Sequence, residues 1–194
     1  SKDPKENTTA DLITKACKKK KIECIIVNTK TTIITSKDED KGTLTVSNYD
    51  GKGAEHTFTG RDTVCITRGG ALEDEAGLSL ISSFQNSQAF MVNTRAAMLT
   101  CDNKLTTALL FEKFGLSTPK TAFITNENNI KSGVDMIGGK FPLILKTLTG
   151  TQGVGVIKID SYEALVATVQ AMWKLEAELL IQEYMPSDFD VRTF

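Results

Sequence analysis

The sequence is poor in the residues that bind structural metals. In 194 residues it contains one histidine, His56, and four cysteines, at positions 17, 24, 65 and 101. A structural zinc site needs about four nitrogen or sulfur ligands, grouped in closely spaced pairs, and these residues form no such pairs. We therefore expect no metal ligands in this chain, and we interpret the cysteines as buried free thiols.

An excess of charge and a long hydrophobic run are also missing. The 23 Lys and Arg nearly balance the 24 Asp and Glu, for a net charge of -1, whereas nucleic-acid-binding domains usually show a basic excess or stripe. The longest aliphatic runs, such as 24–27 and 143–145, are far shorter than the roughly 20 residues of a membrane span. No apolar secretory segment opens the chain. We therefore expect neither a direct nucleic-acid partner nor a membrane partner, and a cytoplasmic location.

The chain begins with a pattern that favours a helix before any strand. Leu12, Ile13, Ala16 and Cys17 recur at helical spacing, which predicts a helix from Thr8 or Thr9 to the lysines at 18–21. The run 22–27 then predicts a buried strand. Because a parallel α/β layer normally begins with a strand, we expect that a first strand is missing before this helix.

The rest of the chain alternates strand-like and helix-like segments, which predicts an α/β (α+β) fold. Up to residue 97, we predict strands at 32–35, 43–47, 64–67 and 90–92, a turn at 50–53 and a helix at 71–84. From residue 98 a second domain follows, with a helix capped by Asp102 and stopped at Gly115. Its remaining predicted elements are strands at 121–125, 142–147, 154–159 and 178–184, and helices at 128–137 and 161–175, with Trp173 in the core.

The segment 142–158 carries the most specific pattern in the sequence. Gly150, Gly153 and Gly155 form a loop whose backbone N–H groups can approach anionic oxygens closely. The spacing fits neither a Walker loop nor a dinucleotide fingerprint, since both open a helix and here a strand follows. The loop is therefore predicted to be the tip of a β-hairpin, with Lys146 on the incoming strand.

Two interpretations of this hairpin stay open from the residues alone. The first is a flexible lid over a nucleotide, with Lys146 as a fixed cation beneath it. The second is an ordinary hairpin with Lys146 and Lys158 in solvent, although a lysine within 143–147 must reach water or find a partner. A protein-kinase hairpin is a weaker alternative, because no His-Arg-Asp or Asp-Phe-Gly element occurs in the sequence.

Five ordered segments between about 90 and 194 resemble the ATP-grasp carboxylate–amine ligases, most closely the RimK-like branch that attaches glutamate or related amino acids. They are 93–104, 114–121, 142–155, 181–184 and 190–192, while 65–69 is similar to the end of the family's pre-ATP-grasp domain. The resemblance implies a small Rossmann-like pre-ATP-grasp domain over 1–97. The first, incomplete part of an ATP-grasp domain would then occupy 98–194.

The resemblance also implies roles for individual residues. Lys104 and Lys146 would contact the nucleotide phosphates, below a lid formed by Gly150, Thr151, Gln152, Gly153 and Gly155. Glu183 and Tyr184 would recognise adenine through their extended backbone. Asp190 would accept hydrogen bonds from the ribose hydroxyls. Arg192 would lie near the acceptor substrate, where a guanidinium can hold a carboxylate, and Arg68 is a second catalytic candidate. For Lys104, Asp190, Tyr184 and Arg192 the residues alone also allow surface, core or ion-pair roles.

The chemistry implied by the resemblance needs ATP and Mg²⁺. ATP would phosphorylate a carboxylate to an acyl phosphate, which an amine then attacks to form an amide. The partners implied are ATP, an amino acid such as glutamate, an acceptor such as a protein C-terminus, and a second copy in a homo-oligomer. The magnesium ligands are expected beyond residue 194, so we expect residues 1–194 alone to be inactive. The alternatives are a non-catalytic nucleotide-binding or protein-interaction module and, more weakly, a kinase-like phosphotransferase.

Overall fold

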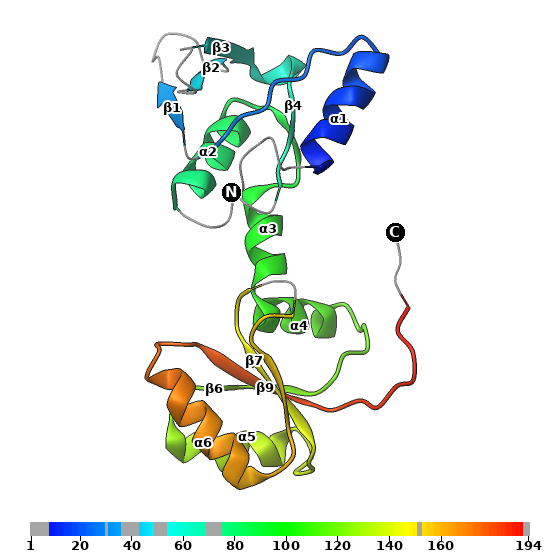
Figure 1. Cartoon of the computed structure of the whole chain (residues 1–194), viewed down its shortest axis with the longest axis vertical. Helices are drawn as coiled ribbons and strands as arrows, with labels where there is room; N and C mark the ends of the chain where they lie inside the picture. The colour runs from blue at the N-terminus through cyan, green and yellow to red at the C-terminus, as the bar shows by residue number, and fades with distance from the viewer. Residues whose placement is uncertain are drawn as a thin grey trace. The chain divides into compact units, whose positions relative to one another are not determined.

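The computed structural model describes residues 8–29, 31–35, 43–48, 54–68, 75–150 and 153–191. The chain forms two compact units, Ser1–Leu99 and Thr100–Phe194, which Figure 1 colours from blue to red along the sequence. Helices and strands alternate in both units, so the predicted mixed α/β class is confirmed.

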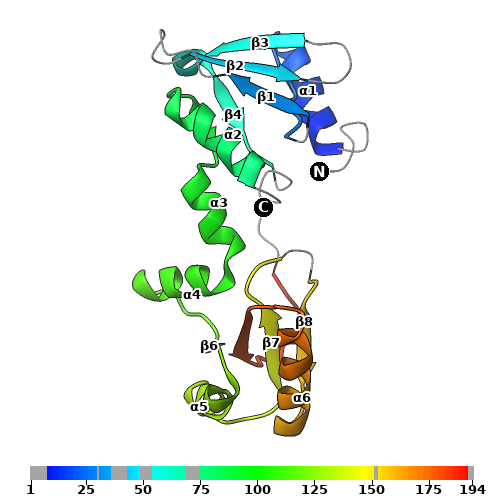
Figure 2. The same cartoon turned by 90° about the vertical axis from the view of Figure 1, so that its left-hand side faces the viewer.

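The N-terminal unit contains two small sheets. Strands β1 (Thr32–Thr35), β2 (Thr43–Asn48) and β3 (Ala54–Thr59) form an antiparallel sheet in the order β1-β2-β3, seen side by side in Figure 2. Strands β4 (Val64–Ile66) and β5 (Phe90–Val92) form a parallel pair. Helix α2 (Glu75–Asn86) connects this pair. Helix α1 (Thr8–Lys19) and the short 3₁₀ turn η2 (Gly60–Asp62) also belong to this unit. Helix α3 (Arg95–Asp102) begins in this unit and ends in the next.

The core of this unit lies between the antiparallel sheet and α2. It is built from Val46 of β2, Leu80 and Phe84 of α2, and Ala89, with Phe58, Cys65 and Met91 packed against them. The rings of Phe58 and Phe84 meet edge to face at 5.2 Å between centroids, a favoured geometry for aromatic pairs. Strand β3 and helix α3 were not predicted from the sequence.

The predicted buried strand over residues 22–27 is wrong. This segment is not a strand in the structure, and Ile22 and Ile26 are 56% and 41% exposed. A run of β-branched residues is typical of a strand, but a strand also needs a neighbouring strand with which to pair. The composition of the run does not specify that neighbour.

The C-terminal unit has a four-stranded antiparallel sheet. Its order is β6-β9-β7-β8, with β6 at Thr121–Ile124, β7 at Leu143–Thr147, β8 at Val156–Ile159 and β9 at Leu179–Glu183. Strands β7 and β8 pair antiparallel in register from Leu143 opposite Ile159 to Lys146 opposite Val156. The predicted β-hairpin is therefore confirmed.

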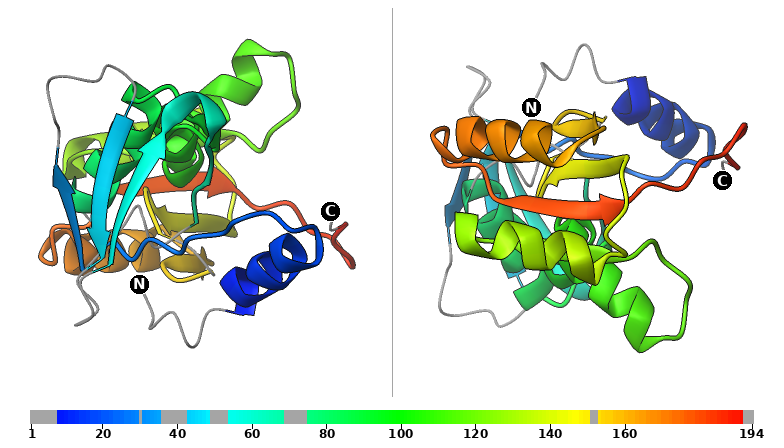
Figure 3. Two further views of the ribbon diagram at one scale, coloured as in Figure 1. Left: turned by 90° about the horizontal axis from the view of Figure 1, so that it is seen from above. Right: turned by 90° about the horizontal axis from the view of Figure 1, so that it is seen from below.

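One face of this sheet is covered by α5 (Ile130–Met136) and α6 (Tyr162–Trp173), as Figure 3 shows. Strand alternation directs Leu143, Leu145, Leu179 and Ile181 into this core, each with no exposed surface. Leu165 and Val169 of α6 are equally buried, and Trp173 packs against the same cluster. The predicted helical stripe and the core role of Trp173 are confirmed.

Several local expectations need correction. Helix α4 (Lys104–Lys113) is capped by Asn103, whose side chain accepts from the N–H of Thr106 at 2.9 Å, and not by Asp102, which ends α3. The helix ends before Gly115, which has a φ of 68°, as the stop signal predicts. The thiols are free but none is fully buried, and Cys101 is exposed. The predicted turn at 50–53 lies outside the described residues.

None of the described helices is long and apolar enough to cross a membrane.

Candidate functional site

The face of the C-terminal sheet opposite its helices carries polar side chains on three neighbouring strands. Gln182 of β9 stands directly opposite Thr121 of β6 and Ile144 of β7. Lys146 is two residues farther along β7, so Gln182 and Lys146 are diagonal neighbours on the same face. Leucine and isoleucine side chains alternate with these positions and point into the core.

Hydrogen bonds join these side chains into a directed chain. The Lys146 ammonium donates to Gln182 Oε1 at 2.6 Å, and Gln182 Nε2 donates to Thr121 Oγ1 at 2.8 Å. The Thr121 hydroxyl in turn donates to the carbonyl of Pro119 at 2.9 Å. Each group uses the donor or acceptor that its neighbour requires, which fixes the orientation of the amide and holds the ammonium in place. Gln182 and Thr121 were not predicted as site residues, although a glutamine in the otherwise apolar run 179–182 is a signal.

Lys104 joins the start of α4 to the end of β7 and the loop that follows. Its backbone N–H donates to the carbonyl of Leu148 at 2.9 Å, and its ammonium donates to the carbonyl of Gly150 at 3.1 Å. Asn103 caps the helix at this point. The first residue of α4 is thereby attached to the loop that leads out of the strand carrying Lys146.

The loop between β7 and β8 depends on glycine at specific positions. Gly150, Gly153 and Gly155 have φ angles of 108°, 76° and 76°, a region that side-chain-bearing residues rarely adopt. A Cβ at Gly155 would also lie 2.5 Å from Thr147 Oγ1. Thr147 is fixed there, because its N–H donates to the Gly155 carbonyl at 2.9 Å and its hydroxyl to the Thr149 carbonyl at 2.7 Å. Thr151 and Gln152 lie outside the described residues.

The two lysines create a positively charged site. Partial burial lowers the pKa of Lys146, and the nearby positive charge of Lys104 lowers it further. Among the described residues, no carboxylate forms an ion pair with either ammonium. Two neighbouring cations, each bonded only to a neutral acceptor among the described residues, favour binding of an anion.

Glu183 and Tyr184 lie where β9 ends. The Glu183 carboxylate accepts from the N–H of Lys120 at 2.8 Å, and the Glu183 N–H donates to the Lys120 carbonyl at 2.9 Å. The side chain of Glu183 therefore fastens β9 to the start of β6. The Lys158 ammonium lies 4.9 Å from the centroid of the half-exposed Tyr184 ring, within cation–π range.

Three predicted site residues remain. Asp190 is exposed, beyond the end of β9, and Arg68 is exposed after β4 in the N-terminal unit. Arg192 lies outside the described residues. Lys104, Lys146 and the glycine loop are thus the predicted residues that the structure brings together.

Metal-binding side chains do not cluster among the described residues. No group of three or more His, Cys, Asp or Glu side chains among them could hold a metal ion.

Residues 101–194 match the model of the RimK-like ATP-grasp domain. The chain is 33% identical to a probable alpha-L-glutamate ligase 1 of Pseudoalteromonas atlantica, over 66% of this chain and 43% of that protein. It is 32% identical to a probable alpha-L-glutamate ligase of Photobacterium profundum, over 71% of this chain and 46% of that protein. The chain therefore spans less than half the length of these relatives.

Two solved structures share the fold at low sequence identity. D-alanyl-alanine synthetase A of Vibrio cholerae aligns with a TM-score of 0.57 and 13% identity, over 80% of this chain and 44% of that one. D-alanine–D-alanine ligase of Helicobacter pylori aligns with a TM-score of 0.52 and 20% identity, over 89% and 47%. The sequence matches carry the assignment, and these folds agree with it. Over residues 101–194, the chain is thus similar to the RimK-like ATP-grasp domain.

Proposed function

We propose that this chain provides part of the ATP site of a ligase that joins a carboxylate to an amine. ATP would phosphorylate the carboxylate to an acyl phosphate, releasing ADP, and the amine would displace phosphate to give an amide. The names of the sequence relatives support an alpha-L-glutamate ligase activity, with glutamate as the amino acid that is attached.

The observation that carries this proposal is the pair of ammonium groups at the glycine loop. Lys104 donates to the Gly150 carbonyl and Lys146 to the Gln182 amide oxygen, so both keep further N–H groups for a ligand. Backbone N–H groups of a glycine-rich loop can approach phosphate oxygens without steric hindrance from a Cβ. Together these groups suit the charge of a nucleotide triphosphate.

The other predicted residues keep their roles as part of this proposal. Gly150, Thr151, Gln152, Gly153 and Gly155 would form the lid over the phosphates. The extended backbone at Glu183 and Tyr184 would pair with the adenine edge through groups other than the Glu183 N–H and carboxylate, both of which bond Lys120. Asp190 would accept hydrogen bonds from the ribose hydroxyls. Arg68 and Arg192 would lie near the acceptor substrate.

Catalysis by these residues would be electrostatic and positional. The two lysines would hold the phosphate chain and neutralise charge that builds up during phosphoryl transfer. Magnesium, when bound with ATP, would supply further charge neutralisation. The N-terminal unit would be the pre-ATP-grasp domain, and the unit from Thr100 the first part of the ATP-grasp domain.

ATP affinity of lysine variants tests this proposal. Lys146→Met should weaken binding by about 1.5 to 3 kcal/mol, the usual contribution of a charge-assisted hydrogen bond, which is roughly tenfold to 150-fold. Lys131→Met is the matched control, because Lys131 is an exposed lysine on α5, which packs on the opposite face of the sheet. Titration calorimetry with ATP compares both with the unchanged chain. Equal ATP affinity of Lys146→Met and the unchanged chain would reject the site.

The ligase activity needs a separate assay. A protein that contains this chain together with the magnesium ligands expected beyond residue 194 should, with ATP, glutamate and a candidate acceptor, form an amide and release ADP and phosphate. Residues 1–194 alone should form no amide. Phosphorylated product without an amide would instead indicate a phosphotransferase.

A further inference from the structure

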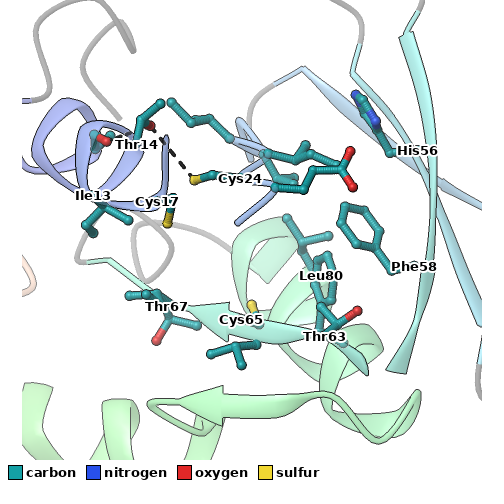
Figure 4. Close-up of a pocket in the computed structure, with 18 of the residues that line it drawn as sticks. Ile13, Thr14, Cys17, Cys24, His56, Phe58, Thr63, Cys65, Thr67 and Leu80 are labelled. Atoms are coloured by element: carbon teal, nitrogen blue, oxygen red, sulfur yellow. Dashed lines mark hydrogen bonds between the residues drawn. The ribbon is translucent and has the colours of Figure 1, made fainter. Parts of the chain in front are cut away.

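The N-terminal unit contains a hollow of about 980 Å³ that is lined by none of the residues proposed to bind ATP. Three cysteines line it: Cys17 of α1, Cys24 in the segment after α1, and Cys65 of β4. Figure 4 shows Cys17 and Cys24 together beside α1, and Cys65 on a different side of the hollow. The proposed ligase chemistry uses none of these thiols.

The end of helix α1 turns the chain back toward the helix. Ile22 N donates to the Cys17 carbonyl at 2.9 Å, and Lys21 N donates to the Lys18 carbonyl at 3.1 Å. Lys21 has a φ of 57°. These two hydrogen bonds and the left-handed residue make up the Schellman motif of a helix end. Residues 18–23 are therefore a closed turn, from which the chain leads directly to Cys24.

The turn places the Cys24 thiol on the face of α1 that carries Cys17. Cys24 Sγ lies 3.9 Å from Thr14 Oγ1, and the Thr14 hydroxyl donates to the Ala10 carbonyl at 2.8 Å. Because a hydroxyl has a single hydrogen, the Cys24 thiol is the donor to Thr14. Thr14 and Cys17 are three residues apart, so they are neighbours on the helix surface. The Cys24 sulfur therefore lies beside the Cys17 side chain.

The two thiols also interact with each other. Partial burial raises the pKa of the Cys17 thiol, and a hydrogen bond with the Cys24 side chain and the charge of Cys24 raise it further. Neither thiol is fully buried, so both keep surface that a small molecule can contact. Cys65 differs from this pair, because burial raises the pKa of its thiol to about 11 and so keeps it protonated and poorly reactive near neutral pH.

We propose that Cys17 and Cys24 form a thiol–disulfide exchange site whose substrate is a low-molecular-weight disulfide. The thiolate of one cysteine attacks the small disulfide, which forms a mixed disulfide and releases the first small thiol. The other cysteine loses its proton, and its sulfur attacks the mixed disulfide, which closes the Cys17–Cys24 bond and releases the second small thiol. The two protein thiols thereby lose two electrons and two protons, and the small disulfide gains them.

The new bond stabilises the N-terminal unit. It joins the end of α1 to a residue that already contacts this helix through Thr14, so its main effect is to remove conformations from the unfolded chain. The folded chain must then form the disulfide more readily than the unfolded chain, by the same factor by which the disulfide stabilises the fold. The stability of this unit therefore follows the ratio of small thiol to small disulfide around the protein.

Equilibration of the chain with reduced and oxidised glutathione tests the proposal. Trypsin cuts after the lysines at 18–21, between the two cysteines. Mass spectrometry without reduction therefore distinguishes a Cys17–Cys24 crosslink, which joins two peptides, from glutathione adducts on separate peptides. We expect the crosslink in the folded chain, with an equilibrium constant roughly 30-fold above that in urea, which is the usual stabilisation by a disulfide expressed as a ratio. The crosslinked chain should also have a higher Tm.

The other cysteines provide matched controls. Cys65 lines the hollow away from α1, and Cys101 is exposed and does not line it. Cys65→Ser and Cys101→Ser should therefore keep the crosslink. Cys17→Ser should leave Cys24 with a glutathione adduct that no second thiol removes.

Two outcomes would overturn the proposal. Glutathione adducts at Cys17 and Cys24 without a crosslink would show that the two sulfurs do not meet. Equal equilibrium constants with and without urea would show that the fold does not bring them together. Both readouts use the unchanged chain, so they do not depend on the folding of a variant. Neither involves ATP, so they are independent of the proposed function.

Discussion

Gln182→Glu offers a sharp test of how the site holds Lys146. The substitution replaces a neutral acceptor, 2.6 Å from the Lys146 ammonium, by a carboxylate of nearly the same shape. An opposite charge at such a distance favours the charged form of the ammonium. We therefore expect the pKa of Lys146, which burial and Lys104 lower in the unchanged chain, to rise.

The same substitution should weaken ATP binding. The new carboxylate would compete with the phosphates for the Lys146 ammonium and would reduce the net positive charge of the site. Loss of one charge-assisted hydrogen bond costs about 1.5 to 3 kcal/mol, so affinity should fall roughly tenfold or more. Gln182→Met removes the acceptor without adding charge, and it should weaken binding less than Gln182→Glu.

Two measurements check this reasoning. Calorimetric titration gives the ATP affinity, and NMR titration of the lysine side chains gives the Lys146 pKa without nucleotide. Gln88→Glu is the control, since it makes the same charge change beside the Arg61 guanidinium of the N-terminal unit, 3.1 Å from Gln88 Oε1. If Gln182→Glu leaves both the Lys146 pKa and the ATP affinity unchanged, Gln182 does not position Lys146 in solution.

Three further predictions concern glycines and pH. Gly155→Ala should weaken ATP binding and destabilise the hairpin, because the new Cβ would meet Thr147 Oγ1 and the φ of this residue is positive. ATP titration measures the first effect and amide exchange the second. An ATP affinity and exchange rates equal to those of the unchanged chain would contradict the loop geometry. Gly60→Ala should destabilise the N-terminal unit by about 3 kcal/mol or more, since the new Cβ would lie 1.5 Å from the Ser87 carbonyl oxygen. An unchanged midpoint of urea unfolding would refute this destabilisation. Because the pKa of Lys146 is lower in the folded chain, the charged ammonium destabilises the fold, and this destabilisation disappears as pH rises toward the unfolded pKa of 10.5. The free energy of unfolding of the unchanged chain, relative to that of Lys146→Met, should therefore increase from pH 7 to pH 10. A decrease over this range would contradict the lowered pKa.

The site illustrates which parts of a binding site local sequence can reveal. The glycines at 150, 153 and 155 and Lys146 are close in sequence, so their joint position in one hairpin follows from the chain itself. Lys104 precedes Gly150 by many residues, and its contact with the Gly150 carbonyl depends on where α4 packs. Before the structure, only the family resemblance connected the two lysines.

The sequence by itself determined the elements whose signals are local. The hairpin with its glycine tip and the amphipathic helix ending near Trp173 follow from residue spacing along a few strands or turns. Burial of one face reinforces each of these patterns, because periodicity specifies which side chains point inward. These elements could be read without knowledge of their neighbours.

Only the tertiary structure decided which elements meet. The order β6-β9-β7-β8 places Gln182 between Thr121 and Lys146, although these residues come from three separate strands. The same dependence on neighbours explains residues 22–27, whose composition suits a strand that the structure does not form. Hydrogen-bond partners in a sheet are chosen by long-range packing, and neither composition nor periodicity records that choice.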